Sequence, residues 1–334
     1  MNWGQGYSAS YYLTIVDPNT WIDTTQVEIT GGSIKRSDGD LIESADIDTV
    51  DYLLDNERII RVWLDARQNG GLSHTPLFTG YAASPNQSRT GTLVNTSISC
   101  YSVLKPAQDV LLPHGWYAPV DTNGEDLVKQ LLKVCKAPVR VECLPKRLSE
   151  PIIAESGESN LSMTWLIMNA LGWTIRINGL GEITVTEYSS YSKENFGINM
   201  NDVLEQEVSI EYDWYECPNV FRATANGYSA IVKDESDASP FSISSRGREI
   251  WAEEEDCDLA EGDDLTSYAA KRLKELQSVV KKVSYDRRFF PDLTIGDVVV
   301  LDYPEQALTG EYEIISQTIT LGPNAKTSEE VQAI

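Results

Sequence analysis

The sequence has few of the residues that usually carry catalysis or covalent cross-links. Of its 334 residues, 2 are histidine and 5 are cysteine. The cysteines are widely spaced, so neither a disulfide framework nor a zinc site of paired cysteines is indicated, and we expect buried, reduced thiols. No Gly-rich phosphate loop, kinase signature or nucleotide-binding fingerprint is present. These absences argue against the common enzyme classes and against a bound metal or cofactor.

The sequence also lacks a long apolar run. No stretch reaches the roughly 20 apolar residues that a membrane-spanning helix needs, and the first residues are polar and uncharged, unlike a secretory signal. We therefore expect a soluble protein made in a cytosol, with no membrane segment. The 16 Tyr and 8 Trp residues argue against disorder, because disordered chains lack the aromatic area that offsets the entropy of ordering.

Basic residues are scarce relative to acidic ones. The chain holds 27 Lys and Arg against 51 Asp and Glu, a formal charge of −24. Counting along the sequence, residues 1–112 carry −6, residues 113–204 carry −3 and residues 205–334 carry −15. Binding to a polyanion needs Lys and Arg to displace counterions, so we expect no specific nucleic-acid binding. The acidity favours either plain solubility or a wall to which passing nucleic acid does not stick.

The first third of the chain reads as β-structure. Runs of β-branched and aromatic residues are separated by polar turns, a pattern typical of a barrel or sandwich of short strands. The runs are residues 11–16, 58–66, 77–82 and 92–101. We expect each of these runs to form a strand of the same β-domain.

The middle of the chain changes to a mixed pattern. Thr122 and Glu125 have capping-box spacing ahead of an apolar helical face. A second helix is predicted to begin near Ser159 or Asn160, and Gly172 is well placed to end it. Two β-rich runs flank residues 178–181 and predict a hairpin. Together these signals predict a compact α/β unit.

The last third returns to strands around one amphipathic helix. Apolar residues at helical spacing place this helix at residues 263–277. Gly296 and Asp297 are expected to turn the chain into a strand, and the polar tail after residues 321–323 is expected to fray. Residues 77–81 faintly echo residues 308–312, which is weak evidence for a repeat between the two β-rich parts.

Candidate ligand-binding residues are few. His74 and His114 lie in polar loops without a nearby nucleophile or metal-ligand spacing, which is typical of locally hydrogen-bonded loop histidines. The acidic run at residues 253–264 offers oxygen ligands but not the spacing of a calcium loop. A cell-wall hydrolase would need two carboxylates facing each other across a cleft, and no pair is singled out. A carbohydrate-binding module would need exposed aromatic residues, for which Trp116 and Tyr117 are the candidates.

Four patterns, taken in order, resemble the tail hub family of long-tailed bacteriophages and related contractile injection particles, the baseplate hub or tail-tip hub proteins. The patterns are residues 76–81 with 97–102, residues 165–173 with the following hairpin, residues 219–223 with 244–248, and residues 293–301 with 308–310. The sequence ends soon after the last pattern, so we expect no appended wall-degrading domain and no enzymatic activity.

The resemblance implies an α+β, mostly β fold, with two tube-like β-barrel domains flanking a small α/β domain. The expected boundaries are residues 1–112, residues 113–204, and residues 205–334 with the helix at 263–277. It also implies a homotrimer, in which six barrels form a pseudo-six-fold ring that adapts a hexameric tail tube to a three-fold spike or tip. The implied partners are the tail tube or distal tail protein hexamer above, the spike or tip protein below, and the tape measure protein. The implied location is the virion tail, assembled in the host cytoplasm.

Within such a ring, the acidic residues would serve the channel for DNA or effectors. Three chains carry a formal −72, and acids that line the bore would repel phosphates and let the genome slide. The candidate channel-lining residues are Glu253, Glu254, Glu255, Asp256 and Asp258. A carbohydrate-binding host-recognition module and a cell-wall hydrolase stay open as alternatives.

Overall fold

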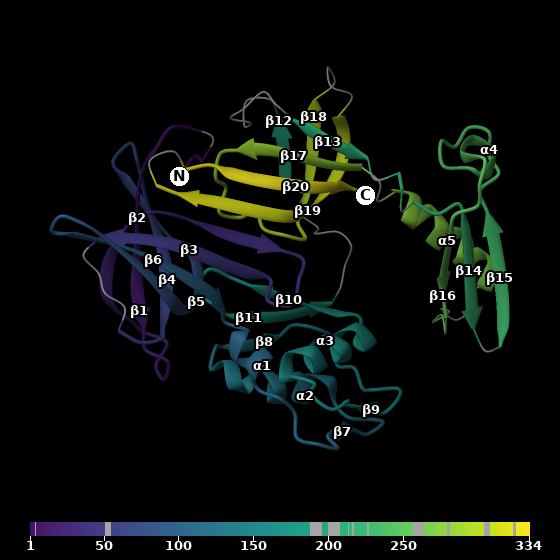
Figure 1. Ribbon diagram of the computed structural model, residues 1–334, viewed down its shortest axis with the longest axis horizontal. Coiled ribbons are helices and arrows are strands. Elements are labelled where there is room, and N and C mark those ends of the chain that lie inside the picture. The colour runs from purple at the N-terminus through teal and green to yellow at the C-terminus, as the bar shows by residue number, and fades with distance from the viewer. Residues whose placement is uncertain are drawn as a thin grey trace. The chain divides into compact units, whose positions relative to one another are not determined.

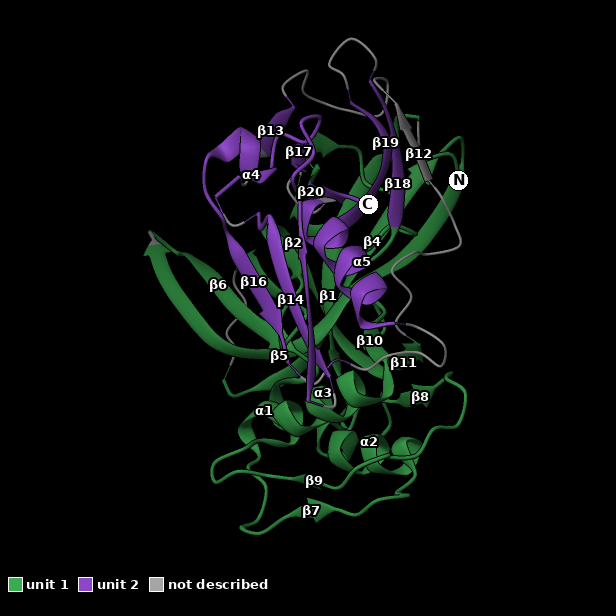
Figure 2. Ribbon diagram, turned by 90° about the vertical axis from the view of Figure 1, so that its right-hand side faces the viewer, with its two compact units in different colours: residues 1–193, 286–297, 315–329 green, residues 194–285, 298–314, 330–334 purple. Residues whose placement is uncertain are grey.

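The computed structural model describes most of the chain, and its fold is mostly β (Figure 1). The described residues are 1–3, 5–50, 55–187, 196–199, 208–212, 214–215, 217–225, 227–255, 257, 264–278, 281–303, 308–322 and 325–334. The chain forms two compact units (Figure 2): unit 1 holds residues 1–193, 286–297 and 315–329, and unit 2 holds residues 194–285, 298–314 and 330–334. No helix within these described ranges is long and apolar enough to cross a bilayer.

The first six strands of unit 1 form a cycle of antiparallel pairs. Strand β1 pairs with both β4 and β2, so the order β1-β4-β5-β6-β3-β2 returns to its start. The four strands expected from the first third of the sequence are confirmed within this cycle. Alternate residues of β3 are buried and point into one apolar core, as a half-buried strand requires. The strands are β1 (Ser8–Val16), β2 (Asp23–Ser37), β3 (Glu43–Val50), β4 (Arg58–Gln68), β5 (Gly71–Thr90) and β6 (Leu93–Ser102).

The middle of the chain forms a mixed α/β region with its own apolar core. Three of its strands form one sheet in the order β10-β11-β8, and two others pair as β7-β9. The elements are α1 (Lys105–Asp109), β7 (Tyr117–Ala118), α2 (Gly124–Leu132), η1 (Lys133–Cys135), β8 (Val139–Val141), β9 (Ile152–Ile153), α3 (Asn160–Leu171), β10 (Trp173–Ile177) and β11 (Ile183–Glu187). The predicted hairpin is confirmed as β10 and β11.

The helix ends of this region follow local side-chain chemistry. Ser159 caps α3 through a reciprocal pair of hydrogen bonds with Ser162, and Gly172 ends the helix with φ of 66°, as expected. The prediction that Thr122 caps α2 is wrong. Asn123 is the cap, and its side-chain oxygen accepts from the backbone N–H of Glu125 at 2.9 Å. Both residue types can cap a helix, and the chain turns one residue later than the spacing suggested.

Six further strands follow the strand order of the first six. In chain order they are β12 (Phe196–Asn199), β13 (Ser209–Tyr212), β17 (Lys281–Arg287), β18 (Val298–Tyr303), β19 (Leu308–Leu321) and β20 (Thr327–Ala333). They pair in the order β12-β18-β19-β20-β17-β13, which is first-fourth-fifth-sixth-third-second. The N-terminal strands have the same permutation. One difference is that β12 pairs with β18 in parallel, whereas β1 pairs with β4 antiparallel.

Two expectations for these C-terminal strands can now be judged. The turn before β18 is confirmed, with Gly296 at φ of 79°. The fraying of the tail is wrong, because residues after 326 form strand β20 with Thr327, Glu329 and Val331 buried. The echo at residues 77–81 and 308–312 falls on β5 and β19, the fifth strand of each set.

The predicted amphipathic helix is confirmed as α5 (Leu265–Ser278), and residue 263 at its expected start lies outside the described residues. Helix α5 packs on a separate three-stranded sheet, in the order β15-β14-β16. Phe221, Ala269 and Leu273 are among the buried residues of this small core. The elements are β14 (Val220–Ala225), β15 (Tyr228–Lys233), α4 (Ile243–Arg246) and β16 (Trp251–Glu254). The insertion therefore lies between the second and third strands of the second set.

Candidate functional site

A hydrogen-bonded cluster around Arg61 joins the N-terminal strands to the hairpin of the α/β region. Arg61 lies in β4 and is 4% exposed. Its Nε donates to the Thr79 hydroxyl at 3.0 Å, and its Nη2 donates to the Leu180 carbonyl at 3.0 Å. The Thr79 hydroxyl in turn donates to the Gly179 carbonyl at 2.8 Å. Two backbone carbonyls of the hairpin turn are thus held by side chains of β4 and β5.

Asp23 balances the buried charge of this cluster. Its carboxylate pairs with the Arg61 guanidinium and also accepts from Trp63 Nε1 at 2.9 Å. Trp21 Nε1 donates to the Leu180 carbonyl at 3.0 Å. Burial lowers the pKa of Arg61, and Asp23 opposes that shift. Because each polar group has a partner, the cluster holds the hairpin in one position without a buried unpaired charge.

The hairpin approaches the first β-region closely at a glycine. A Cβ atom added to Gly179 would lie 2.1 Å from the Pro76 carbonyl oxygen and 2.4 Å from its carbon. Backbone atoms cannot move aside as a flexible side chain can, so only glycine fits at this position. The hairpin signal was visible in the sequence, but the need for glycine at residue 179 comes from a contact about a hundred residues away in the chain.

A second buried polar network connects strands of both β-sets within unit 1. Arg287 of β17 is fully buried and forms a bidentate pair with Glu329 of β20, with Nε to Oε2 at 2.7 Å. Gln317 of β19 donates to Glu329 at 2.8 Å and accepts from Arg36 Nη1 of β2 at 2.9 Å. Arg36 also donates to the Leu77 carbonyl at 2.6 Å. The network therefore ties the N-terminal strands to the C-terminal strands by directional bonds.

At the far end of this network, Glu43 lies beside Arg36. Its side chain is 1% exposed, and its Oε2 lies 3.7 Å from Arg36 Nε. Burial raises the pKa of Glu43 to about 8, and the neighbouring Arg36 charge works against that rise. Glu43 Oε1 has no hydrogen-bond partner among the described residues. A raised carboxyl pKa can mark a catalytic acid, but Glu43 is enclosed in a core and does not line a cleft.

The outer surface of β1, β4 and β5 carries a stack of rings. The ring centroids of Trp63 and His74 are 4.1 Å apart at 12°, and those of Tyr12 and His74 are 5.9 Å apart at 23°. His74 Nδ1 lies 2.6 Å from an Asp65 carboxylate oxygen. His74 was expected to be a loop histidine, but it lies in β5 and is held by its neighbours on adjacent strands. No three potential metal-ligating His, Cys, Asp or Glu side chains cluster anywhere in the part of the chain that the structure describes.

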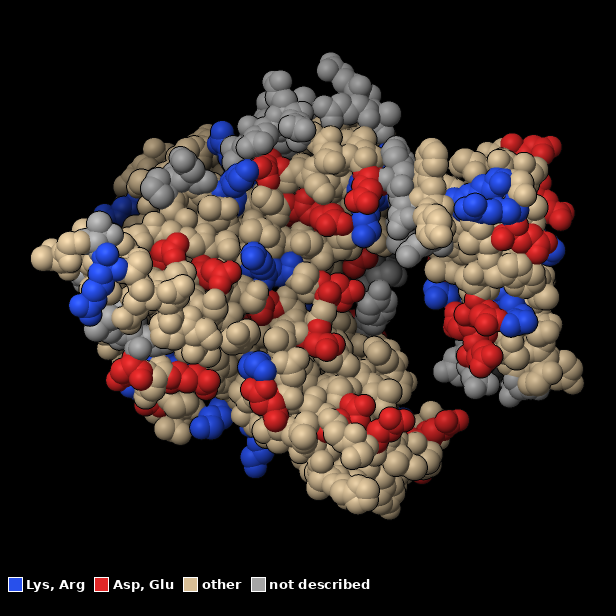
Figure 3. All heavy atoms as spheres, viewed as in Figure 1, with Lys and Arg blue, Asp and Glu red and all other residues tan. Residues whose placement is uncertain are grey.

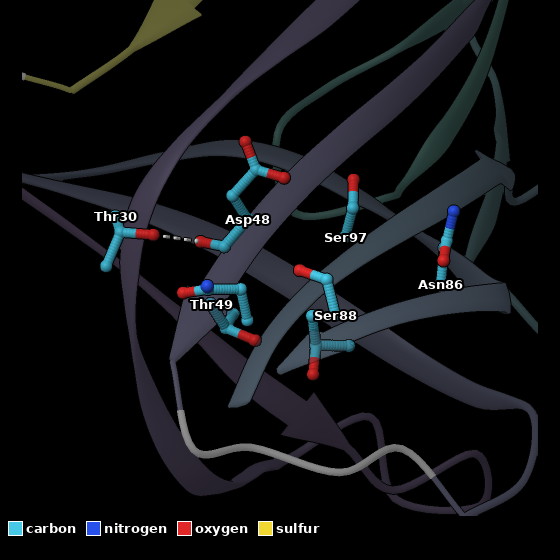
Figure 4. Close-up of a pocket in the computed structure, with 8 residues that line it drawn as sticks. Thr30, Asp48, Thr49, Asn86, Ser88 and Ser97 are labelled. Atoms are coloured by element: carbon cyan, nitrogen blue, oxygen red, sulfur yellow. Dashed lines mark hydrogen bonds between the residues drawn. The ribbon is translucent and has the colours of Figure 1, made fainter. Parts of the chain in front are cut away.

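Two open cavities lie among the described residues of unit 1. One, of about 340 Å³, is lined only by polar side chains of β2, β3, β5 and β6 (Figure 4), among them Thr30, Asp48, Asn86 and Ser97. In it, the Thr30 hydroxyl donates to the Asp48 backbone carbonyl at 3.1 Å. The other, of about 510 Å³, lies where β1, β4 and β5 meet α1 and η1, and Tyr81 is among its lining residues.

The predicted channel-lining acids lie in or just after β16. Glu253 forms an ion pair with Arg222 of β14, and Glu254 accepts from the Tyr268 hydroxyl and from Arg272 of α5. Glu255 is exposed. Asp256 and Asp258 lie outside the described residues. The two paired acids thus have local partners in unit 2, which the linear run of acids in the sequence did not reveal.

The surface seen in Figure 3 is not dominated by one sign of charge. Acidic and basic side chains alternate over the visible face of both units. Among the described residues, charged side chains of opposite sign form ion pairs in each unit, such as Lys326 with Asp286 in unit 1 and Lys233 with Glu249 in unit 2. On this face the acidic side chains are interspersed with basic ones and do not form one continuous patch.

The aromatic pair proposed for sugar binding does not form an exposed cluster among the described residues. Tyr117 is 61% exposed, but Trp116 packs against the core of the α/β region. Trp173 is 2% exposed and belongs to the same core. His114 lies in a turn between α1 and β7, in the polar loop that was expected.

The Arg61 cluster was missed by the sequence analysis, although one signal was present. An arginine interrupts the apolar run Ile59-Ile60-Arg61-Val62, and a charged residue in a buried strand needs a partner. No local pattern identified Asp23 or the hairpin carbonyls as that partner, because they are distant in the sequence.

No protein-family model and no curated protein matches the sequence. Solved structures with a similar fold include the 43 kDa tail protein of prophage MuSo2 from Shewanella oneidensis, with a TM-score of 0.70 and 15% identity over 98% of each chain. The tail protein from Neisseria meningitidis MC58 gives a TM-score of 0.68 and 15% identity over 98% of this chain and 97% of that one. Prophage tail protein gp18 from Listeria monocytogenes EGD-e gives a TM-score of 0.56 and 12% identity over 97% of this chain and 94% of that one.

These similarities span almost the whole of this chain and of each neighbour, so they concern the complete arrangement of elements and not one shared motif. At such low identity they establish the fold alone. The resemblance to the phage tail hub family that the sequence patterns indicated is therefore confirmed at the level of the fold, which this chain shares with phage tail proteins.

Proposed function

We propose that the protein is a structural hub of a phage tail baseplate or tail tip. In this role three copies form a ring, each copy contributes two tube-like β-barrels, and the ring adapts a hexameric tail tube to a three-fold spike or tip. The observation that carries the proposal is the repeated strand order in the two sets of six strands. Its full-length similarity in fold to phage tail proteins supports the same role.

The repeated strand order matters because of symmetry. A ring closes through one interface that is repeated from subunit to subunit. Two modules of the same topology in one chain can each occupy one position of a six-position ring, so three chains fill it. The cycle of pairs in the first set, which returns to β1, fits a barrel. The second set supplies six strands in the matching order for the other position.

The polar networks suit a structural role better than a catalytic one. The Arg61 cluster fixes the α/β region against the first strands, and the Arg287–Glu329 network fixes the C-terminal strands to β2. Both join distant strands by buried hydrogen bonds, and in the second network only Arg36 Nε and Glu43 Oε1 have no partner among the described residues. A part that joins two symmetries must hold its modules in fixed register, and directional buried bonds provide that.

The proposal also assigns a channel and partners. The ring would line the path for DNA or effectors, with acids such as Glu255 facing that path, and would lie in the virion between tube and tip proteins. If the acids keep nucleic acid from sticking, a triple variant with Glu253, Glu254 and Glu255 changed to Lys should retain DNA on a filter at low salt, and the parent protein should not. Equal retention by both proteins would contradict the channel role of these residues.

The mass in solution tests the main proposal. Light scattering of the purified protein should give three times the chain mass of 37.2 kDa, about 112 kDa. A mass that stays at one chain at every concentration tested would contradict the hub. The carbohydrate-binding alternative has lost its expected aromatic cluster among the described residues, and it would regain support only if purified host glycans bound and Trp116→Ala abolished the binding.

A further inference from the structure

Strand β19 shows how the fifth strand of the second set uses its two edges. Residues 308–313 pair with β18, and residues 316–321 pair with β2. Strand β20 occupies the opposite edge of β19. The residue after β20 also contacts β19, since the Ile334 N–H donates to the Glu311 carbonyl at 3.2 Å. One edge of β19 is therefore filled by two strands in succession, first β18 and then β2.

Strand β5, the fifth strand of the first set, has the same layout with one place left open. Residues 71–82 pair with β4, and residues 80–90 pair with β6 on the opposite edge. Beyond residue 82, no described strand pairs with the edge that β4 has left. Figure 2 shows β5 and β6 continuing as a long hairpin at this end. The open edge of β5 corresponds to the part of β19 that holds β2.

Burial reflects this difference between the two strands. Residues 84–89 of β5 are all exposed, on both faces of the hairpin. In β19 the residues next to β2 alternate between buried and partly buried, with Gln317, Ile319 and Leu321 buried. A strand with an unfilled edge and two exposed faces is a template for pairing with another chain.

Strand β13 offers a complementary edge. Strand β13 is the second strand of its set, as β2 is of the first, and it pairs with β17 in the way that β2 pairs with β3. Strands β2 and β13 align on the residues that pair with the first residue of β3 and of β17. On this alignment Ser33 and Ile34 of β2 correspond to Ser209 and Ile210 of β13. The other edge of β13 has no partner strand within the described residues.

We propose that residues 86–89 of β5 pair antiparallel with β13 of a second copy of this chain, reproducing between copies the β19–β2 pairing found within one. The inference rests on the proposed function, because a closed ring of alternating modules needs one repeated junction. The last β5 residue that pairs with β4 is Ala82, opposite Arg58, and the last β19 residue that pairs with β18 is Glu313, opposite Val298. Counting the same number of residues onward from each, and using the β19–β2 register, places Gln87 opposite Glu211. The bulge after Ala82 leaves this register defined to within one residue.

The chemistry of the two edges fits a specific contact between copies. Apart from Pro85, residues 84–89 are polar, and Pro85 has no backbone N–H to donate to a neighbouring strand. Both features keep an open edge from pairing indiscriminately. Pairing would then run over the residues after Pro85. Arg89 and Glu211 carry opposite charges close to the same register, which adds a modest preference for this pairing over a pairing of β5 with β5.

Cysteine cross-linking tests the pairing directly. Cys143 is less buried than the other four cysteines, so it is first changed to Ser to remove an accessible thiol. In this background Glu211→Cys is combined in turn with Asn86→Cys, Gln87→Cys or Ser88→Cys. Directly opposite residues of antiparallel strands have Cα atoms about 4.5–5.5 Å apart, within the range for a disulfide. Mild oxidation should yield covalent dimers and trimers that reductant removes, and one of the three combinations should dominate by at least about tenfold.

The matched control is Ser97→Cys with Glu211→Cys. Ser97 is equally exposed and lies on the same hairpin, but both edges of β6 are filled, by β5 and β3. It should give only background cross-linking. Hydrogen exchange on the unmodified protein provides a second readout, since the amides of residues 86–89 should exchange at least about tenfold more slowly in the assembled form than after dilution.

The outcomes separate this inference from the hub itself. A trimer that forms without cross-linking above the Ser97 control, and without protection of residues 86–89, would overturn the strand pairing and leave the hub proposal standing. A protein that stays monomeric at every concentration would overturn both. Cross-linking together with a trimeric mass supports both.

Discussion

Replacing Thr79 by valine tests whether the Arg61 cluster fixes the α/β region to the first β-region. Thr79 is fully buried, accepts from Arg61 Nε at 3.0 Å and donates to the Gly179 carbonyl at 2.8 Å. Valine has nearly the same shape, so the change removes two hydrogen bonds and little else. A hydrogen bond to a charged group contributes about 1.5–3 kcal/mol and a neutral one about 0.5–1.5 kcal/mol. We expect Thr79→Val to lower the free energy of unfolding by about 2–4 kcal/mol.

The same substitution at Thr49 is the control. Thr49 lies in β3 and is 1% exposed, but its hydroxyl has no hydrogen-bond partner among the described residues. Removing it leaves no donor or acceptor newly unsatisfied there, so Thr49→Val should change stability by less than about 1 kcal/mol. Urea unfolding followed by tryptophan fluorescence, with an unchanged slope, measures both variants. Equal losses for Thr79→Val and Thr49→Val would refute the reasoning.

Three further predictions concern backbone fit, buried charge and pH. Gly179→Ala should destabilise the protein by about 1–3 kcal/mol in thermal unfolding, because the added Cβ meets the Pro76 backbone. Gly39→Ala, whose Cβ would have no atom within 4 Å, should leave stability unchanged. Equal effects of the two substitutions would count against the close approach at Gly179. Arg287→Met removes the positive partner of the buried Glu329 carboxylate and should lower the free energy of unfolding in urea by about 3–5 kcal/mol. Lys282→Ala, at an exposed ion pair, should lower it by less than about 1 kcal/mol, and equal losses for the two variants would contradict the buried network. Burial raises the pKa of Glu43 in the folded protein to about 8, so the native protein loses stability as pH rises from about 4.5 to about 8. Across that window the free energy of unfolding of Glu43→Gln should rise relative to that of the parent, as measured by unfolding at several pH values. A difference in free energy between the two proteins that does not change with pH would disprove the pKa shift.

Local patterns predicted the elements that depend on neighbours in sequence. The α3 caps at Ser159 and Gly172, the β10–β11 hairpin and the turn at Gly296 all follow from residues within a few positions of each other. The α2 cap failed by one position, because Thr122 and Asn123 are both able to cap and only the path of the chain decides between them.

Elements that depend on distant partners were not predictable in the same way. Strand β20 looked like a fraying tail because its inward-facing residues include Thr327 and Glu329, which a pattern of apolar alternation does not recognise. Glu329 is stable in the core because Arg287 pairs with it over forty residues earlier in the chain. The separate core around α5 was also missed, since an amphipathic face does not say which sheet it will cover.

The candidate channel acids illustrate the same limit. The run that begins at Glu253 reads as uniform in the sequence, yet Glu253 and Glu254 have different partners, Arg222 and Arg272. In contrast, the faint echo between residues 77–81 and 308–312 identified the two strands that turned out to be equivalent in topology. A short sequence echo carried information because β5 and β19 occupy the same place in the two strand orders.

The most direct test of the central claim is an end-on electron micrograph average of the assembled protein. The account predicts a ring of six similar β-lobes around a pore, in which two kinds of lobe alternate and only three-fold symmetry is exact. A ring with three lobes, a true six-fold ring of six chains, or an assembly in which the two strand sets do not alternate around a common pore would contradict it.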